Sequence, residues 1–112
     1  MDCLFCKMAA GEIPVNKVFE DESVLAFHDI DPQAPVHFLV IPKKHIGSPA
    51  EIQPEDGELV GHIFAVIAQI AKEMGLEKGY RVVTNSGEDA GQSVHHLHFH
   101  VLAKRSLAWP PG

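Results

Sequence analysis

Three histidines near the end of the chain alternate with large apolar residues, in the segment HHLHFHVL at residues 95–102. In an extended strand successive side chains point to opposite faces, so His96, His98 and His100 would share one face while the apolar residues between them enter a core. Neighbours in this row would have Cα atoms about 6.5–7 Å apart. The spacing places the imidazole of His98 between two others. This arrangement predicts a functional site rather than a solution to core packing.

Two kinds of chemistry are open to this row. In the first, the histidines bind a transition metal, but the outer pair, roughly 13 Å apart along the strand, would have to lean fully inward. In the second, His98 attacks phosphorus, because neutral imidazole is abundant at pH 7 and a phosphohistidine-type intermediate splits one hard step into two. His96 and His100 would then orient the ring and donate hydrogen bonds to phosphoryl oxygens. The alternative to both is that these are surface histidines on an edge strand, without a chemical role.

The loop before the row fits the second chemistry. Ser93 follows Gly91-Gln92. A hydroxyl there could bind a phosphoryl oxygen or help protonate a leaving group, and Gly91 would let backbone N–H groups approach phosphate.

Composition excludes several classes of function. The chain of 112 residues fits a single domain spanning 1–112. Its net charge of −6 argues against a nucleic-acid polymer or an anionic membrane as partner. No apolar run approaches the roughly 20 residues needed to span a bilayer, and no signal peptide is evident. Two cysteines cannot make a disulfide framework, so we expect a cytoplasmic protein.

The remaining pattern predicts an α+β fold with a mostly antiparallel five-stranded sheet, one long helix and a short N-terminal helix. The long helix is expected to begin at Pro54 and to end before Gly75, with apolar residues repeating at helical spacing. The other expected elements are a short helix at 3–10 and strands at 18–20, 24–27, 35–41, 80–84 and 95–102.

The chain resembles the histidine triad (HIT) superfamily and, within it, the histidine triad nucleotide-binding proteins, which are purine nucleoside phosphoramidases. The resemblance rests on six segments and covers almost the whole length: 25–30, 32–35, 37–45, 91–94, 96–102 and the closing WPPG at 109–112. It implies a HIT-like fold and a single HIT domain.

The resemblance also implies roles for individual residues. His98 would be the nucleophile, His96 would fix its tautomer, and His100 and His37 would line the phosphate site. Asp29 would accept hydrogen bonds from the ribose hydroxyls. The base and phosphate contacts would come from Phe5, Phe27, His28, Ile30, Asn85, Gly91, Gln92 and Ser93.

The implied activity is hydrolysis of adenosine 5′-phosphoramidates, including aminoacyl-adenylate-like substrates, to AMP and an amine, with no metal required for catalysis. Two subunits would pair through the long helix and adjacent strands as a homodimer. The alternatives are hydrolysis of dinucleoside polyphosphates by the same covalent route, and a nucleotide- or zinc-binding interaction module with little activity.

A second cluster begins with the C-x-x-C pair Cys3 and Cys6. Alone, this pair is compatible with a zinc half-site, a redox pair or two buried side chains, and the βαβ unit expected of a redox motif is absent. Some bacterial members of the family combine such a pair with histidines that correspond to His45 and His96. The resemblance therefore implies a structural zinc bound by Cys3, Cys6, His45 and His96.

Overall fold

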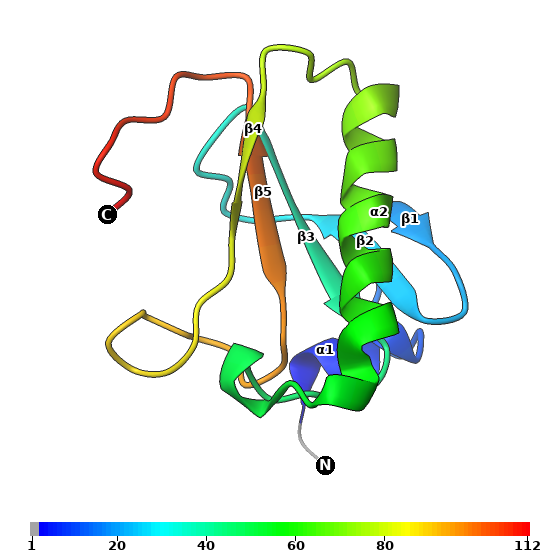
Figure 1. Ribbon diagram of the computed structural model, residues 1–112. Coiled ribbons are helices and arrows are strands. Elements are labelled where there is room, and N and C mark those ends of the chain that lie inside the picture. The colour runs from blue at the N-terminus through cyan, green and yellow to red at the C-terminus, as the bar shows by residue number, and fades with distance from the viewer. Residues whose placement is uncertain (1–2) are drawn as a thin grey trace.

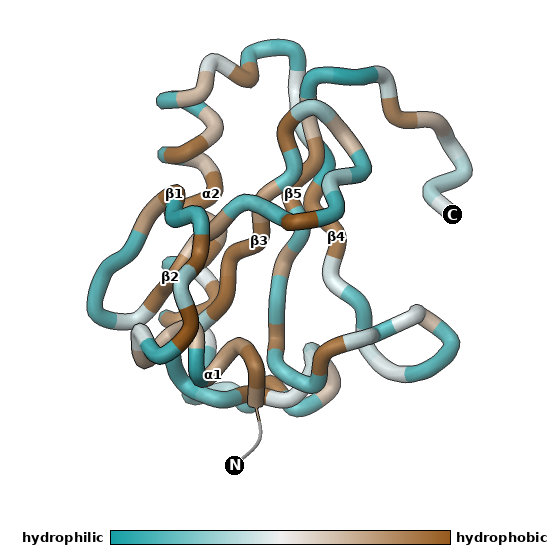
Figure 2. Tube along the Cα trace, turned by 180° about the vertical axis from the view of Figure 1, so that it is seen from behind, coloured by the Kyte–Doolittle hydropathy of each residue, from teal (hydrophilic) through white to brown (hydrophobic). Residues whose placement is uncertain are grey.

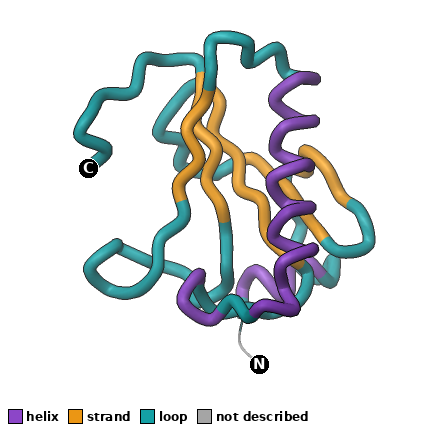
Figure 3. Tube along the Cα trace, viewed as in Figure 1, coloured by secondary structure: helices purple, strands orange, loops and turns teal. Residues whose placement is uncertain are grey.

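Five strands form one antiparallel sheet in the order β1-β2-β3-β5-β4 (Figures 1 and 3). The structure is a computed structural model and describes residues 3–112. The strands are β1 (Lys17–Glu20), β2 (Val24–His28), β3 (Val36–Pro42), β4 (Tyr80–Val83) and β5 (Phe99–Ala103). The predicted α+β fold, with its five-stranded sheet and two helices, is confirmed.

Both faces of the central strands carry a hydrophobic core, because β-branched and aromatic residues occupy consecutive positions along β2 and β3. Alternate side chains of β3 separate into two clusters: Phe38 and Val40 pack toward α2, while Leu39 and Ile41 pack against Phe5 of the N-terminal helix. Figure 2 shows the hydrophobic colouring concentrated in these strands and the hydrophilic colouring in the loops. The sheet therefore has a helix-covered face and a second face that is available for a site.

The long helix α2 (Gly57–Glu73) covers one face of the sheet and packs against it through Ile63, Val66, Ile67 and Ile70. It begins after two short 3-10 helices, η1 (Pro49–Glu51) and η2 (Pro54–Asp56), rather than directly at Pro54. At its other end Gly75 adopts φ +70°, the left-handed conformation typical of a helix stop. Among the described residues, no helix has the length and hydropathy needed to cross a bilayer.

The short helix α1 (Leu4–Ala9) lies on the opposite face. Cys3 is its N-cap, and its sulfur accepts a hydrogen bond from the backbone N–H of Cys6 at 3.1 Å. Phe5 is its buried residue and joins the second core cluster. One turn of helix thus brings two sulfur atoms and an aromatic ring against the same side of the sheet.

The last strand begins at Phe99, not at His95 as the alternation predicted. Continuing the β3 register Val40↔Phe99 would place Leu97 opposite Pro42, which has no N–H to donate. The Leu97 N–H instead donates to the carbonyl oxygen of Ile46 at 2.6 Å. Even so, Leu97, Phe99 and Val101 all enter the core beneath α2, so the predicted alternation of faces holds beyond the hydrogen-bonded strand.

Candidate active site

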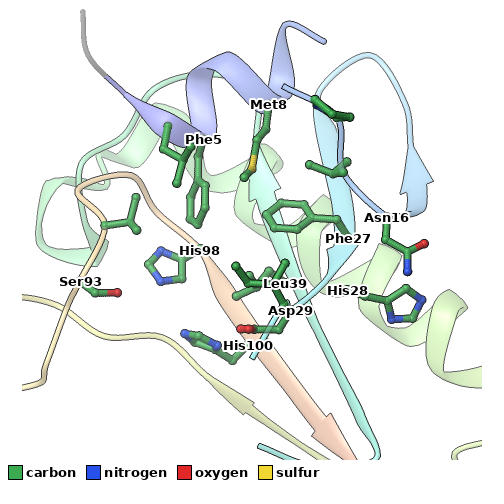
Figure 4. A pocket seen from close by; sticks show the side chains of 15 residues that line it. Phe5, Met8, Asn16, Phe27, His28, Asp29, Leu39, Ser93, His98 and His100 are labelled. Atoms are coloured by element: carbon green, nitrogen blue, oxygen red, sulfur yellow. The ribbon is translucent and has the colours of Figure 1, made fainter. Parts of the chain in front are cut away.

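A cavity of about 610 Å³ opens on the face of the sheet that carries α1 (Figure 4). This volume lies within the range of small-molecule sites, roughly 300–1,000 Å³. Its wall combines apolar side chains with a few polar groups at opposite ends. The lining residues are Leu4, Phe5, Met8, Pro14, Val15, Asn16, Phe27, His28, Asp29, Ile30, Leu39, Ser93, Val94, His98 and His100.

The imidazole of His98 is held in one tautomer by the backbone. Its Nδ1 lies 2.7 Å from the carbonyl oxygen of His96, which can only accept a hydrogen bond, so Nδ1 carries the proton. The lone pair of the neutral ring is then on Nε2. Phe5 packs edge-on against the same ring, with centroids 5.2 Å apart. The arrangement presents an oriented, neutral nitrogen base at the wall of the cavity.

His37 and His100 form a second imidazole pair next to it. The backbone N–H of Gln33 donates to Nδ1 of His37 at 3.0 Å, so the neutral His37 ring carries its proton on Nε2. That Nε2 lies 2.9 Å from Nδ1 of His100 and donates to it, which leaves the proton of His100 on its own Nε2. Burial, followed by the proximity of His98 and His37, lowers the pKa of His100 to about 4. At neutral pH His100 is therefore an uncharged hydrogen-bond donor.

Asp29 lies beside this pair, with Oδ2 at 3.4 Å from Nε2 of His37. Its other oxygen, Oδ1, accepts the backbone N–H of Asp31 at 2.8 Å, which fixes the carboxylate at the cavity. Asp29, His37 and His100 are close enough to suggest a metal site. The tautomer argues against one, because the His37 Nε2 that would have to bind the ion is occupied by a proton.

The segment at 85–93 supplies to the cavity wall one of the four residues that the resemblance implies as phosphate contacts. Ser93 lines the cavity, whereas Asn85, Gly91 and Gln92 do not. The side chain of Gln92 donates to the carbonyl oxygens of Gly47 (2.7 Å) and Val94 (3.0 Å) and accepts the N–H of Gly87 (3.0 Å). In this structure Gln92 therefore ties the loop together and orients Ser93 indirectly.

The predicted base-enclosing residues Phe5, Phe27, His28 and Ile30 all line the cavity. The rings of Phe5 and Phe27 meet edge-to-face at 5.6 Å. Ile30 is fully exposed at 101%, an apolar side chain left at the rim without a covering neighbour. Sequence reasoning missed the other lining residues, which are Leu4, Met8, Pro14, Val15, Asn16, Leu39 and Val94; only Leu39, two positions along β3 from His37, carried a signal that could have been used.

A cluster of possible metal ligands, with one ligand atom from each residue lying within 4.8 Å of the others, is formed by Cys3, Cys6, His45 and His96. The closest separations are 3.2 Å from Cys3 Sγ to His96 Nδ1, 3.2 Å from Cys6 Sγ to His45 Nδ1, and 3.1 Å between the two Nδ1 atoms. Tetrahedral zinc with two sulfur and two nitrogen ligands requires separations of about 3.3 to 3.8 Å, which follow from its bond lengths.

The tautomer of His96 also suits a metal. Nε2 of His96 lies 2.8 Å from the carbonyl oxygen of Pro42 and must donate to it, so the lone pair of His96 is on Nδ1, facing the sulfur atoms. Burial, with Cys3 as a further cause, raises the pKa of the Cys6 thiol to about 11. A bound cation would have to displace that proton. The donor set fits a structural zinc ion.

The five-stranded sheet with α2 and the row of His96, His98 and His100 are those of a histidine triad protein, and the sequence model of the HIT domain family matches residues 10–107. The chain belongs to the HIT domain family.

Its relatives are similar over nearly the full chain. An uncharacterized HIT-like protein of Synechococcus elongatus is 50% identical over 111 residues, 99% of this chain and 97% of that protein. The crystal structure of a HIT family hydrolase from Legionella pneumophila is 50% identical with a TM-score of 0.97, covering 99% of this chain and 100% of that one. A histidine triad nucleotide-binding protein from Candida albicans is 34% identical with a TM-score of 0.86, covering 97% and 83%.

Proposed function

We propose that this protein is a nucleotide-binding hydrolase that cleaves the P–N bond of adenosine 5′-phosphoramidates, including aminoacyl-adenylate-like substrates, and releases AMP and an amine. The observation that carries the proposal is the hydrogen bond from His98 Nδ1–H to the His96 carbonyl oxygen, because it leaves Nε2 as a nucleophile at the cavity wall. The relatives described as a hydrolase and as a nucleotide-binding protein support the class of substrate and reaction.

The reaction takes two steps. In the first, Nε2 of His98 forms a bond to the α-phosphorus as the P–N bond to the amine breaks; the Ser93 hydroxyl donates its proton to the departing nitrogen and recovers one from solvent water. In the second, water attacks the same phosphorus and releases a proton to solvent while the imidazole leaves, which frees AMP and restores His98. The Nε2–H of neutral His100 donates to a phosphoryl oxygen as negative charge builds there.

The rest of the cavity suits a nucleoside. The Asp29 carboxylate accepts hydrogen bonds from the ribose hydroxyls, because its second oxygen has lone pairs available. Phe5, Phe27 and Ile30 provide apolar and aromatic surface for a purine. The predicted contacts of Asn85, Gly91 and Gln92 with the phosphate remain predictions, since these residues lie outside the cavity wall.

The test compares wild type with His98→Ala and with His95→Ala, a matched control at an exposed position outside the cavity. His98→Ala should lower hydrolysis of adenosine 5′-phosphoramidate at least about a thousandfold while AMP binding persists. Quenched turnover followed by mass spectrometry should find one adenylyl group on the peptide that contains His98. Faster cleavage of diadenosine tetraphosphate than of the phosphoramidate would favour the polyphosphate alternative, and binding without turnover of either would favour an interaction module.

Structural zinc held by Cys3, Cys6, His45 and His96 forms part of this proposal. Its role would be to hold α1 against the sheet, since two ligands lie at the start of that helix and two lie in the segments that follow β3 and precede β5. No step of the hydrolysis passes through it.

Pairing of two copies into a homodimer is also part of the proposal. Within the described residues β4 pairs with β5 alone, which leaves one edge of the sheet open beside α2. Phe64 on α2 and Tyr80 on β4 are large apolar side chains that are 47% and 41% exposed. A second copy at this edge would cover both residues and extend the sheet.

A further inference from the structure

The turn between β2 and β3 is bonded to the segment that follows β5. Nε of Arg105 donates to the carbonyl oxygen of Gln33 at 3.0 Å, across 72 residues of sequence. Gln33 in turn gives its backbone N–H to Nδ1 of His37. We propose that Gln33 and Arg105 are positioning residues of the active site, which set His100 to donate a hydrogen bond to a phosphoryl oxygen. This inference rests on the proposed function, which places the phosphate at His98 and His100.

The turn leaves Gln33 little freedom to move. Pro32 and Pro35 stand on either side of it, and their rings hold φ at about −65°. The side-chain Nε2 of Gln33 donates to the carbonyl oxygen of Asp31 at 3.0 Å, within the turn. The guanidinium of Arg105 adds the restraint from outside, and its Nη1 also donates to its own segment, so it links the turn to the end of β5.

The neutral pair of His37 and His100 has two possible proton arrangements. In one, Nε2–H of His37 donates to Nδ1 of His100, 2.9 Å away, and His100 carries its own proton on Nε2. In the reverse arrangement Nδ1 of His100 donates instead, and its Nε2 presents a lone pair to the phosphate. The choice between them decides whether His100 is a donor or an acceptor at the phosphate site.

The N–H of Gln33 selects the first arrangement. In the reverse one, the proton of neutral His37 would be on Nδ1, 3.0 Å from the Gln33 nitrogen, and two N–H groups would point at each other. Asp29, which Figure 4 shows beside His100, acts in the same sense because its Oδ2 lies 3.4 Å from Nε2 of His37. His37 is 6% exposed, so water has little access to replace a lost partner.

Nitrogen-15 NMR of the histidine rings measures the tautomers and needs no substrate. In wild type His100 should carry its proton on Nε2 alone. Gln33→Pro removes the N–H, so about one-fifth or more of His100 should then be protonated on Nδ1, the remainder being held by Asp29. Gln33→Ala keeps the N–H and should keep the wild-type tautomer. An ester between Pro32 and Gln33 removes the same N–H without a second proline ring and should act as Gln33→Pro does.

Turnover of adenosine 5′-phosphoramidate measures the consequence for catalysis. The His100 donor acts on charge that builds in the transition state, so Gln33→Pro should lower kcat about tenfold or more and change KM less than about threefold. Gln33→Ala should lose less of kcat than Gln33→Pro. General loosening of the cavity would instead raise KM in both variants.

The part of Arg105 is tested by hydrogen exchange of the Gln33 amide. Arg105→Ala removes the restraint from outside the turn, so this proton should exchange about fivefold faster or more, and kcat should fall as it does in Gln33→Pro. Lys78→Ala removes an equal charge from the exposed turn after α2 and should change neither quantity.

The inference is overturned by a wild-type His100 protonated on Nδ1, or by a Gln33→Pro or ester protein that keeps the wild-type tautomer or a kcat within about twofold of wild type. An unchanged exchange rate in Arg105→Ala would overturn the role of Arg105. Each result leaves the proposed function intact if wild type hydrolyses phosphoramidate through His98. A wild type without that activity would remove the proposed function, while the tautomers measured without substrate would stand.

Discussion

The ring of Phe5 lies edge-on against the imidazole of His98, with centroids 5.2 Å apart and planes at 84°. Phe5 stands between Cys3 and Cys6 on α1, so the helix that supplies this contact is the one whose start lies in the thiol–imidazole cluster. Anything that loosens the start of α1 therefore acts on the cavity wall as well as on the cluster.

Phe5→Ala should weaken both stability and nucleotide binding. The residue is 5% exposed and packs on Phe27 and His98, and removing such a ring from a core costs about 3 kcal/mol or more. Urea denaturation and AMP titration of the same samples measure the two effects. Phe5→Leu keeps most of the apolar volume and should retain most of the stability, so equal losses in both variants would contradict a packing role.

Zinc removal should lower thermal stability and AMP affinity together. We expect about one equivalent of zinc in protein purified without chelator, and less than about one-tenth would count against the site. Cys6→Ser should abolish tight binding and reproduce the effect of a chelator on melting temperature. Ser106→Ala, far along the chain and outside the cluster, serves as the matched control and should keep its metal.

The affinity for zinc should fall as the pH is lowered. The pKa of Cys6 is raised to about 11, so at neutral pH the thiol is protonated and the metal must displace a proton to bind. Competition with a fluorescent chelator between pH 6 and pH 8 measures this dependence. An affinity that does not change over that range would show that Cys6 is not a ligand.

The protein should become less stable as the pH is lowered into the mildly acid range, because of His100. The pKa of a histidine is about 6.5 in the unfolded chain, and that of His100 is lowered to about 4 by burial and by the neighbouring His98 and His37. Between these two values the unfolded state binds more protons, so the free energy of unfolding rises with pH. The stability linked to neutral His100 is complete above pH 6.5 and is lost as the pH falls toward 4.

Denaturation of wild type and His100→Gln at pH 7, 5.5 and 4.5 isolates this contribution. The slope of the free energy of unfolding against pH should be shallower in the variant. Parallel slopes would mean that His100 titrates normally in the folded protein.

Phe64→Glu should convert a dimer into monomers if the open β4 edge and the exposed face of α2 form the subunit contact. Light scattering after size exclusion at micromolar concentration is the measurement. Gln69→Glu, exposed on the opposite flank of the same helix, adds the same charge without removing an apolar contact and serves as the matched control. A wild-type monomer would exclude the predicted pairing.

The sequence predicted the elements and the histidine face well because both follow from local periodicity. Leu97, Phe99 and Val101 enter the core as their alternation required. The predicted start of β5 was wrong by four residues. The observed start depends on Pro42, a residue of another strand that has no N–H to donate to the ladder.

Other features depend on long-range contacts that no local pattern carries. Asn16 reaches the cavity only because its carbonyl pairs with His28 at the end of β2. The resemblance implied a phosphate contact for Gln92, which stays a prediction; what no local pattern shows is that its amide bonds to backbone groups of Gly47, Gly87 and Val94. Neither relationship has a signature in the spacing of nearby residues.

The tautomer of His98 is selected by a peptide carbonyl and not by a carboxylate side chain. A systematic alanine scan would therefore report no orienting partner for the nucleophile, because every variant at position 96 keeps its main-chain oxygen. Exposing that dependence requires a change to the backbone itself, such as an ester in place of the peptide bond after His96. Its carbonyl is a weaker acceptor, but it also removes the Leu97 N–H that donates to Ile46. The effect therefore has to be compared with that of an ester in place of the peptide bond after Ile46, which weakens only the acceptor of that second bond.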